Sequence, residues 1–383
     1  MVLDHEFPPD VRVENELEAL AVKGHQVHLA SLTRKKLPSL DKFGKAVIHR
    51  KYISKFRLKT SVGALKFPFY FNFWRRYLNE LFAKEHFDAI HIHDLPLAAV
   101  GFEISRKYNV KFVLDLHENW PVLLELSDHT QTFLGKLLSS YEQWKKYEVE
   151  FCNKADHVVV VVEEAKDRLV KLGIPKEKIT VVSNTLNFNQ FKVPDKSPDP
   201  DYFTAIYSGG INRHRGLQYV IKGLKYLKKA PKPFRLWILG AGSYVEELKH
   251  LARKEGVEQM VTFFGWQPFD EMQKYFALAD LFLIPHSKSE HTDNTIPHKI
   301  FQYMYAKKPI VSSNCAPLVR IITEAKAGLV YQYDDPQDFS DKVKMLMKGE
   351  VKDRIDVDFA YQLVLEKYNW EKDSGRLLKI YEN

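Results

Sequence analysis

The sequence predicts an α/β protein built on two doubly wound parallel sheets. Short apolar segments with the length of buried strands alternate with amphipathic helical patterns along nearly the whole chain, and this alternation is typical of parallel sheets. A proline-rich, polar segment at residues 191–203 separates two halves of similar size, and its composition indicates an interdomain linker. We therefore expect one domain over residues 1–192 and a second over 193–360, with a cleft between them.

The first half begins with a strand pattern and then a helix. Because Met1 to Leu3 looks like the end of a strand, we expect a few residues in front of Met1 in the native chain. The apolar residues of 12–23 fall on one face of a helix, and Gly24 follows as its C-terminal cap. Further strands are expected at 25–32, 87–94, 111–121, 157–169 (where the strand runs into a helix) and 178–187.

The second half repeats the alternation. Helical patterns such as the one at 217–227 lie between apolar segments of strand length. The strands are expected at 203–207, 234–239, 261–264, 281–284, 309–312 and 328–331.

Composition excludes several classes of protein. With 45% hydrophobic and 13% aromatic residues, the 383-residue chain can form a core and is not of the disordered class. Cys152 and Cys315 are far apart, which argues against a disulfide framework and a structural zinc site and favours a reducing compartment. No signal peptide opens the chain, and no apolar run approaches the roughly 20 residues that cross a bilayer. We therefore expect a cytoplasmic protein.

The net charge of +8 is concentrated in residues 45–86. This segment holds ten lysines and arginines against Glu80 and Glu85, so its surplus of eight equals that of the whole chain, and it also holds ten aromatic residues. Cationic side chains interleaved with aromatic rings suit an anionic membrane surface, which would place the protein peripherally on the inner face of the cytoplasmic membrane. A nucleic acid would also suit the charge, although we expect none, and a solvated basic face over core aromatics is the structural alternative.

The segment from Asn294 to Ser313 reads as a polar turn, a helix and a buried strand. Pro297 suits the first position of a helix, and Pro309 stops that helix before the strand. The start of such a helix offers free backbone N–H groups and the positive end of its dipole, where an anion such as a diphosphate binds. Gln302, further along, could reach a sugar attached to that phosphate. The plain alternative is one more βα unit of a parallel sheet.

Glycine turns follow three of the strands expected in the second half. Gly209 and Gly210 let the backbone approach a ligand closely, and Arg213 and Arg215 behind them could clamp a diphosphate, because guanidinium groups match phosphate oxygens. Ordinary turns with solvated arginines are the alternative. Weaker signals of the same kind are the turn at Gly240 and the strand end at Gly265 and Trp266, where backbone groups could read a nucleobase.

Polar residues follow the expected strands of the first half as well. In a parallel sheet, ligands bind beyond the carboxyl ends of the strands, and a histidine placed there can carry a proton or bind a sugar hydroxyl. A structural role for each histidine is the alternative. No nucleophile elbow, Walker loop or His-Glu-x-x-His pattern is present, and a metal site is not indicated. The rule that ligands bind beyond the carboxyl ends of parallel strands selects one possible cluster, which consists of His93, Asp94, His117, Glu118 and Asn184.

Taken in order, these motifs resemble the family 4 glycosyltransferases, which are retaining enzymes of the GT-B fold. The match covers nearly the whole chain. It implies two Rossmann-like domains facing each other across a cleft, with a nucleotide-diphosphate sugar bound mainly by the C-terminal domain and an acceptor by the N-terminal one. It also implies that the final helix, in 361–383, packs back on the N-terminal domain. The motifs include HIHD (91–94), LDLHENWP (114–121), YSGGINRHRGL (207–217), FFGWQP (263–268), NTIPHKIFQYMYAKKPIVSS (294–313) and YNW (368–370).

The resemblance and the patterns above together give a set of expected site residues. The catalytic residues are expected to be His117, Arg215 and Lys299, and no metal or other cofactor is expected. The acceptor is expected at Asp10, Arg12, Asp94 and Glu118. The donor is expected at Gly209, Gly210, Arg213, Gly240, Gly265, Trp266, Asn294, Thr295, Ile296 and Gln302.

Three positions depart from the family pattern. The family usually carries an arginine where Gly210 stands, and glutamates where Asn294 and Gln302 stand, while Arg215 fills the second basic position. A glutamate accepts hydrogen bonds from both ribose hydroxyls, whereas Gln302 has one acceptor oxygen and one donor group. Glutamine in place of glutamate at position 302 keeps the length of the side chain and loses its negative charge. We interpret it as a subfamily variant, and weakened or lost activity is the alternative.

The implied reaction moves a hexosyl or N-acetylhexosaminyl group from a nucleotide-diphosphate sugar to an acceptor hydroxyl with retention of configuration. Front-face displacement, in which the leaving phosphate takes the acceptor proton, is the implied mechanism. The acceptor is expected to be a lipid-linked or cell-envelope saccharide. Two alternatives stay open, namely a nucleotide-sugar epimerase of the same fold and a non-catalytic nucleotide-sugar-binding protein.

Overall fold

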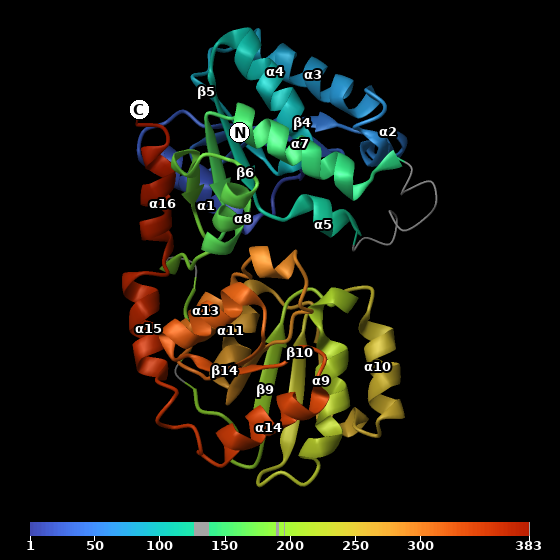
Figure 1. Cartoon of the computed structure of the whole chain (residues 1–383), viewed down its shortest axis with the longest axis vertical. Coiled ribbons are helices and arrows are strands. Elements are labelled where there is room, and N and C mark those ends of the chain that lie inside the picture. The colour runs from blue at the N-terminus through green and yellow to red at the C-terminus, as the bar shows by residue number, and fades with distance from the viewer. Residues whose placement is uncertain (126–137, 189–190, 195, 383) are drawn as a thin grey trace. The chain divides into compact units, whose positions relative to one another are not determined.

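The computed structural model describes residues 1–125, 138–188, 191–194 and 196–382, and it divides them into two compact α/β units. Unit 1 consists of the residues up to Ser183 together with those from Asp373 onward, and unit 2 runs from Asn184 to Lys372. Each unit carries one sheet with helices packed against it (Figure 1). The expected α/β class with two Rossmann-like domains is therefore confirmed.

The sheet of unit 1 is parallel except at one edge. Its strand order is β3-β4-β2-β1-β5-β6-β7-β8, and β3 pairs with β4 in the antiparallel sense. The strands are β1 (Val2–Glu6), β2 (His28–Thr33), β3 (Leu40–Phe43), β4 (Ala46–Tyr52), β5 (Ala89–His93), β6 (Lys111–Leu116), β7 (His157–Val160) and β8 (Ile179–Val181). The helices are α1 (Val11–Val22), α2 (Lys55–Lys59), α3 (Phe69–Phe82), α4 (Ala98–Tyr108), α5 (Trp120–Glu125), α7 (Tyr141–Lys154), α8 (Glu163–Lys171) and most of α16 (Trp370–Lys379).

The alternation of side chains along β5 separates the two faces of this sheet. Ile92 points toward α4, where a Cβ added to Gly101 would lie 2.4 Å from its Cγ1 atom. Its neighbours His91 and His93 point to the opposite face, on which His91 lies near Glu16 of α1. Figure 1 shows α3, α4 and α7 side by side on the Ile92 face. The polar residues at the ends of β5 and β6 therefore lie on the α1 face.

Unit 2 has a fully parallel sheet of six strands in the order β11-β10-β9-β12-β13-β14. The expected strands of the second half are confirmed as β9 (Phe203–Ser208), β10 (Phe234–Leu239), β11 (Val261–Gly265), β12 (Leu281–Ile284), β13 (Ile310–Ser313) and β14 (Gly328–Tyr331). The helices are α9 (Leu217–Gly223), α10 (Val245–Lys254), α11 (Phe269–Ala277), α12 (Lys299–Tyr305), α13 (Ala316–Ala325), α14 (Pro336–Met347) and α15 (Val357–Glu366).

The expected domain boundary at 192/193 differs from the division at Ser183 and Asn184. The segment interpreted as a linker includes Phe191, which is fully buried against Phe269, Phe276 and Tyr305 of unit 2. Burying one aromatic ring holds the start of this proline-rich segment to unit 2 in spite of its polar composition. The composition therefore indicated a connection between the domains but misplaced it.

The C-terminal region also divides between the units. Helix α16, the final helix that was expected to pack back on the first domain, lies mostly in unit 1, because the chain from Asp373 onward belongs to that unit. Helix α15 belongs to unit 2. There the Tyr381 hydroxyl forms a 2.6 Å hydrogen bond with His91 Nδ1, and Lys111 Nζ donates to the Ile380 carbonyl at 2.8 Å. The C-terminal turn thus completes the α1 face of unit 1.

The basic segment at 45–86 is not one continuous surface. Its first part is β4, a strand that the sequence reading missed, and Arg50 on it is buried and bonded to Asp41 at 2.7 Å. In α3, four of the aromatic rings of the segment are buried: Tyr70, Phe71, Trp74 and Tyr77. The structural alternative, a basic face over aromatic residues of the core, therefore holds for part of the segment. The exposed basic and aromatic residues of the segment lie around α2 and the start of α3. No helix among the described residues is long and apolar enough to span a membrane.

Candidate functional site

Three of the glycine turns in unit 2 touch one another at the carboxyl edge of the sheet. The Gly209 N–H donates to the Leu239 carbonyl at 2.9 Å, and the Gly240 N–H donates to the Gly265 carbonyl at 2.7 Å. A Cβ on Gly240, whose φ is 142°, would lie 1.9 Å from the Gly209 oxygen. Only glycine fits there. The loops after β9, β10 and β11 therefore form one surface of closely packed backbone.

Arg215 is fixed beside this surface by the loop that follows β12. A Cβ on Gly216 would lie 1.7 Å from the Pro285 oxygen, and the Ser287 N–H donates to the His214 carbonyl at 2.9 Å, so the two loops are in direct contact. The Arg215 guanidinium lies 3.2 Å from His286 Nε2. Burial, and after it the charge of Arg215, hold the pKa of His286 well below its usual range. Neutral His286 thus accepts from Arg215 and orients it.

Lys299, the first residue of α12, brings a second basic side chain to the same place. Its Nζ lies 4.0 Å from the centre of the Tyr207 ring, and a Cβ on Gly209 would lie 2.8 Å from it. Among the described residues, no carboxylate pairs with Lys299 or Arg215. Two basic side chains that converge on glycine backbone without a carboxylate partner form a site suited to a phosphate anion.

The helix that was expected to bind an anion is shorter than its pattern suggests. Helix α12 begins at Lys299, two residues after Pro297, although the Ile300 N–H bonds to the Pro297 carbonyl at 3.3 Å. With seven residues, it adds little dipole, so the charge at this site comes from side chains. The side chain of Gln302 is half-buried and forms no hydrogen bond with another described residue, which leaves its amide free for a ligand.

The remaining expected donor residues are less closely involved. Asn294 donates its side-chain amide to the Glu290 carbonyl at 2.6 Å and so holds its own loop. Trp266 is 72% exposed at the end of β11, and Arg213 is exposed as well. The carbonyl of Ile296 accepts from Asn184 at 3.2 Å, and Ile296 itself is buried beside the half-buried Thr295. Gly210 accepts at its carbonyl from the Tyr207 hydroxyl at 2.7 Å.

The cluster expected in the first half forms without Asn184, which begins unit 2. His117 lies between two carboxylates of unit 1, with its Nε2 3.2 Å from Asp115 Oδ2 and its Nδ1 3.6 Å from Asp94 Oδ2. Burial opposes its charge, but the carboxylates of Asp94 and Asp115 raise the pKa of His117 to about 9. At neutral pH His117 is therefore an imidazolium, which can donate to a sugar oxygen.

Arg12 was expected to bind the acceptor, and the structure corrects this. The Arg12 side chain is 4% exposed, and it donates to both carboxylate oxygens of Asp115 at 2.9–3.1 Å and to the Val182 carbonyl at 2.8 Å. Burial opposes the charge of Asp115, but Arg12 and then His117 hold the pKa of that carboxyl well below its usual range. Arg12 therefore positions Asp115, which in turn holds His117. Asp115 was missed because it lies one residue inside the end of β6, whereas the expected site residues follow the strands.

The neighbours of His117 differ in how they are held. Asp94 has a φ of 65°, which non-glycine residues seldom adopt. Its carboxylate accepts a hydrogen bond from the backbone N–H of His117 at 3.2 Å. Asp10 caps α1 at the Val13 N–H and lies 3.2 Å from His5. Burial opposes its charge, but the hydrogen bond from His5 and the charge of His117 lower the pKa of Asp10. Glu118 is half-buried.

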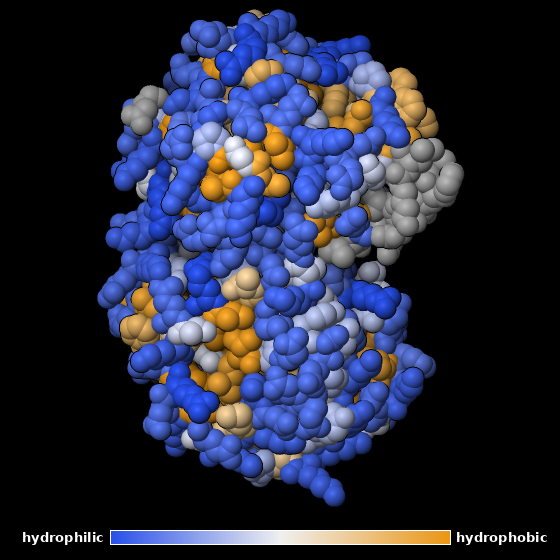
Figure 2. All heavy atoms as spheres, in the orientation of Figure 1, coloured by the Kyte–Doolittle hydropathy of each residue, from blue (hydrophilic) through white to orange (hydrophobic). Residues whose placement is uncertain are grey.

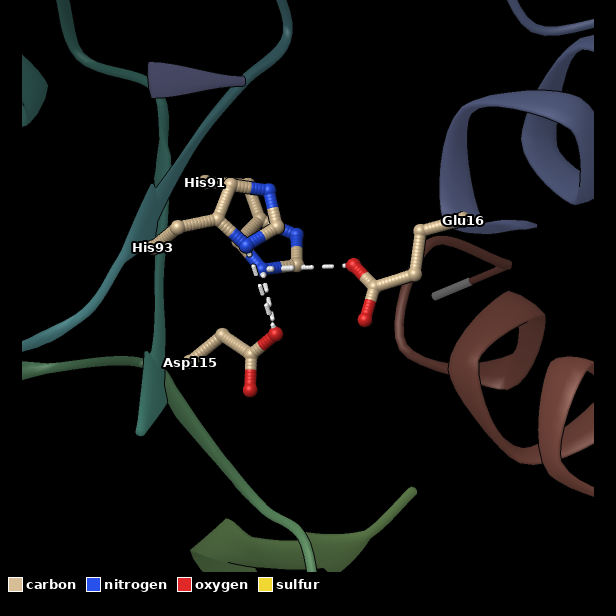
Figure 3. Close-up of side chains that lie close together, drawn as sticks. All are labelled: Glu16, His91, His93 and Asp115. Carbon is tan, nitrogen blue, oxygen red and sulfur yellow. Dashed lines mark ion pairs between the residues drawn. The ribbon is translucent and has the colours of Figure 1, made fainter. Parts of the chain in front are cut away.

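Figure 3 shows four buried residues of unit 1 that could hold a metal ion by distance alone: Glu16, His91, His93 and Asp115. His91 Nε2 and His93 Nδ1 lie 3.6 and 3.4 Å from Asp115 Oδ2. That oxygen, however, already accepts from Arg12 and from His117. A metal would have to lie against the Arg12 cation, so the donor set does not fit one. Burial above all, partly offset by Arg12, raises the pKa of Glu16 to about 8, which leaves a proton where a metal would be.

The raised pKa of His117 predicts a loss of stability at alkaline pH. A group whose pKa is higher in the folded protein stabilises it fully below the unfolded value, near 6.5, and this contribution is lost as the pH rises through about 9. The difference in unfolding free energy between the wild type and His117→Gln, measured in urea, should therefore shrink between pH 6 and pH 10. His86→Gln is the control, because the His86 side chain is 87% exposed. A difference that stays constant with pH would contradict this assignment.

Comparisons with known proteins bear on the family and the fold of this chain. Residues 10–190 match the model of glycosyltransferase family 4, and residues 189–360 match that of glycosyl transferases group 1. A relative in Escherichia coli, named as a colanic acid biosynthesis glycosyltransferase, is 24% identical over 247 residues, and the alignment covers 61% of each chain. Among solved structures, the sucrose-phosphate synthase of Thermosynechococcus elongatus superposes with a TM-score of 0.79 at 16% identity over 100% of this chain and 94% of its own. The Anabaena protein HepE, in complex with UDP, superposes with a TM-score of 0.73 at 13% identity. That superposition covers 100% of this chain and 98% of HepE.

Proposed function

Because the chain belongs to the family 4 glycosyltransferases, we propose that it transfers a sugar from a nucleotide-diphosphate sugar to an acceptor hydroxyl. The observation that carries this proposal is the pair of basic side chains, Arg215 and Lys299, set against the glycine backbone of unit 2 with no carboxylate partner among the described residues. In such a transfer, charge develops on the diphosphate as it leaves, and fixed cations stabilise it. No metal is needed for that task in this proposal.

The other donor contacts follow from the positions of the remaining residues. We propose that exposed Trp266 and the backbone of Gly265 bind the base, and that the amide of Gln302, which has no hydrogen bond with another described residue, binds a ribose or sugar hydroxyl. We propose uracil as the base, since HepE binds UDP in a structure of the same fold. Retention of configuration by front-face displacement, with the leaving phosphate taking the acceptor proton, is part of the proposal, as is binding of the acceptor beside His117, Asp10 and Asp94.

The test has two stages. Thermal unfolding is measured first with UDP, GDP, ADP, CMP and dTDP and their common sugars. A ligand at about 100 times its Kd stabilises the protein by about 2.7 kcal/mol, so a binding nucleotide gives a clear shift. Transfer from the responding nucleotide sugar to saccharide acceptors is then assayed in the presence of EDTA, with product configuration read by NMR. Free nucleotide released without acceptor would favour an epimerase, and binding without any turnover would favour a binding protein.

We further propose a cell-envelope or lipid-linked saccharide as acceptor and a peripheral, cytoplasmic location at the membrane. The support is a surface around α2 and the start of α3, which we call the α2–α3 surface; Figure 2 shows an apolar patch over these elements. A groove of about 360 Å³ lies between Lys51, Arg57, Phe69 and Arg76. Basic and aromatic groups arranged in this way suit anionic headgroups. The exposed aromatics of the surface are Tyr52, Phe56, Phe67 and Phe69, at 49–83% exposure.

Removing two charges from the α2–α3 surface should weaken membrane binding. Each basic residue near an anionic surface contributes about 1 kcal/mol, so replacing Arg57 and Arg76 with glutamine should lower affinity for phosphatidylglycerol vesicles by roughly thirtyfold. Co-sedimentation with vesicles measures this. Arg50 and Arg75 are left in place because they are paired with Asp41 and Glu103.

The matched control removes the same charge from a different element. Arg253 and Lys254 are exposed on α10 of unit 2, and replacing both with glutamine should leave vesicle binding nearly unchanged. If both variants lose vesicle affinity equally, the effect is due to net charge alone. If neither loses affinity, the α2–α3 surface does not bind the membrane.

A further inference from the structure

Lys299 is held in an unusual environment for a lysine. Its side chain is half-buried, and its Nζ lies over the Tyr207 ring at 4.0 Å. The space that it occupies exists because residue 209 lacks a Cβ, which would lie 2.8 Å from Nζ. The ammonium has therefore lost part of its water and gained a ring face and backbone in exchange.

The titratable groups that face Lys299 do not favour its charge. Arg215 approaches from the loop after β9, His286 from the loop after β12, and Tyr207 from β9 itself. The His286 imidazole is neutral, and within the part of the chain that the structure describes no carboxylate forms an ion pair with Lys299. Burial, and after it the charge of Arg215, hold the pKa of Lys299 well below its usual range.

A bound diphosphate would reverse this balance. Two negative charges placed between Arg215 and Lys299 supply the counter-ion that the protein omits, and an opposite charge within about 4–6 Å favours the protonated amine. Resting on the proposed function, we propose that Lys299 is a neutral amine in the empty site and takes up a proton from solvent when the diphosphate of the donor binds.

This coupling would set how the site recognises its ligand. Residue 210 is a glycine, so this position lacks a guanidinium that would be permanently charged. The second positive charge of the site is then that of Lys299, and it is present only when an anion is bound. An empty site then holds one fixed cation, and its glycine backbone does not have to accommodate two repelling charges. Lys299 acts here as a binding residue that responds to the charge of the ligand.

The experiment is titration calorimetry with UDP-glucose, whose diphosphate has no titrating proton between pH 6.5 and 9. Measurements in HEPES and in Tris, which differ in ionisation enthalpy and contain no phosphate that could occupy the site, give the number of protons taken up. We expect uptake approaching one proton at a pH where free Lys299 is neutral, and an affinity that falls about tenfold per pH unit above that point. Lys299→Arg carries a permanent charge and should bind with no proton uptake and no such fall.

Lys307→Arg is the matched control. Lys307 follows the same helix but is paired with exposed Asp358 at 2.8 Å, so its replacement should leave proton uptake as in the wild type. Binding of UDP-glucose by the wild type with no proton uptake, or equal uptake in Lys299→Arg, would overturn the inference and leave the proposed function standing. No binding of UDP-glucose would count against the proposed uridine donor, and the inference would fall with it.

Discussion

Replacing Arg215 with methionine is expected to lower kcat by roughly a hundredfold to a thousandfold. The guanidinium is oriented by His286 at 3.2 Å beside the glycine backbone and has no competing carboxylate among the described residues. A preorganised donor aimed at developing charge contributes about 2.7–4 kcal/mol to the transition state. Initial rates of sugar transfer from the nucleotide sugar selected by thermal unfolding measure the effect. KM should rise less than kcat falls, because the charge on the diphosphate grows as it leaves.

Arg213→Met is the matched control for this change. Arg213 is two residues away, exposed, and forms no side-chain hydrogen bond or ion pair with another described residue. An exposed charge in solvent contributes at most about 1 kcal/mol, so this variant should lose no more than about fivefold. Thermal unfolding of both variants separates lost catalysis from lost folding. Equal rate losses for the two arginines would mean that the clamp had been assigned to the wrong residue.

Replacing Asp115 with asparagine is expected to destabilise unit 1 by about 3–5 kcal/mol. The change removes the counter-ion of fully buried Arg12, which donates to both oxygens of that carboxylate. Leaving a buried charge without its partner costs this much because the charge cannot reach water. Urea unfolding, followed by far-UV circular dichroism, measures the loss. His117 also loses its closest acceptor, so its pKa should fall, and an NMR titration of its ring would record the shift.

Glu16→Gln is the control in the same cluster. Burial raises the pKa of Glu16 to about 8, so the native side chain carries a proton near neutral pH and an amide resembles it closely. This variant should change the unfolding free energy by less than about 1 kcal/mol. A loss as large as that of Asp115→Asn would show that Glu16 is a charged partner of Arg12. It would also reopen the question of a metal among Glu16, His91, His93 and Asp115.

The regular part of the fold could be predicted because the strands are apolar runs bounded by turn residues. All six strands of unit 2 lie within a residue or two of their expected positions. The exceptions have physical causes. Strand β4 was missed since Arg50 interrupts its apolar pattern, and the charge of that residue is met by Asp41 on the neighbouring strand. The domain boundary was misplaced because one buried ring, Phe191, outweighs the polar residues that follow it.

The site could be predicted where the chemistry requires a particular residue type. The glycines of the turns and the cations Arg215 and Lys299 are of this kind, and the structure brings them together. Residues that act through a partner were harder to find. His286 orients Arg215 from a different loop, and Arg12 binds Asp115 across 103 positions of sequence. The available signal was the spacing of Arg12 and Glu16, one helical turn apart, which places a carboxyl group beside Arg12 on α1.

The last ten or so residues of unit 1 have a consequence for the order in which the protein can form. Tyr381 reaches His91 only after all of unit 2 has been synthesised, because unit 2 lies between them in the chain. On the ribosome, unit 2 therefore has its whole sequence before unit 1 does, although unit 1 begins first. During translation His91 therefore lacks its Tyr381 partner until all of unit 2 has been synthesised, so unit 1 is completed after unit 2.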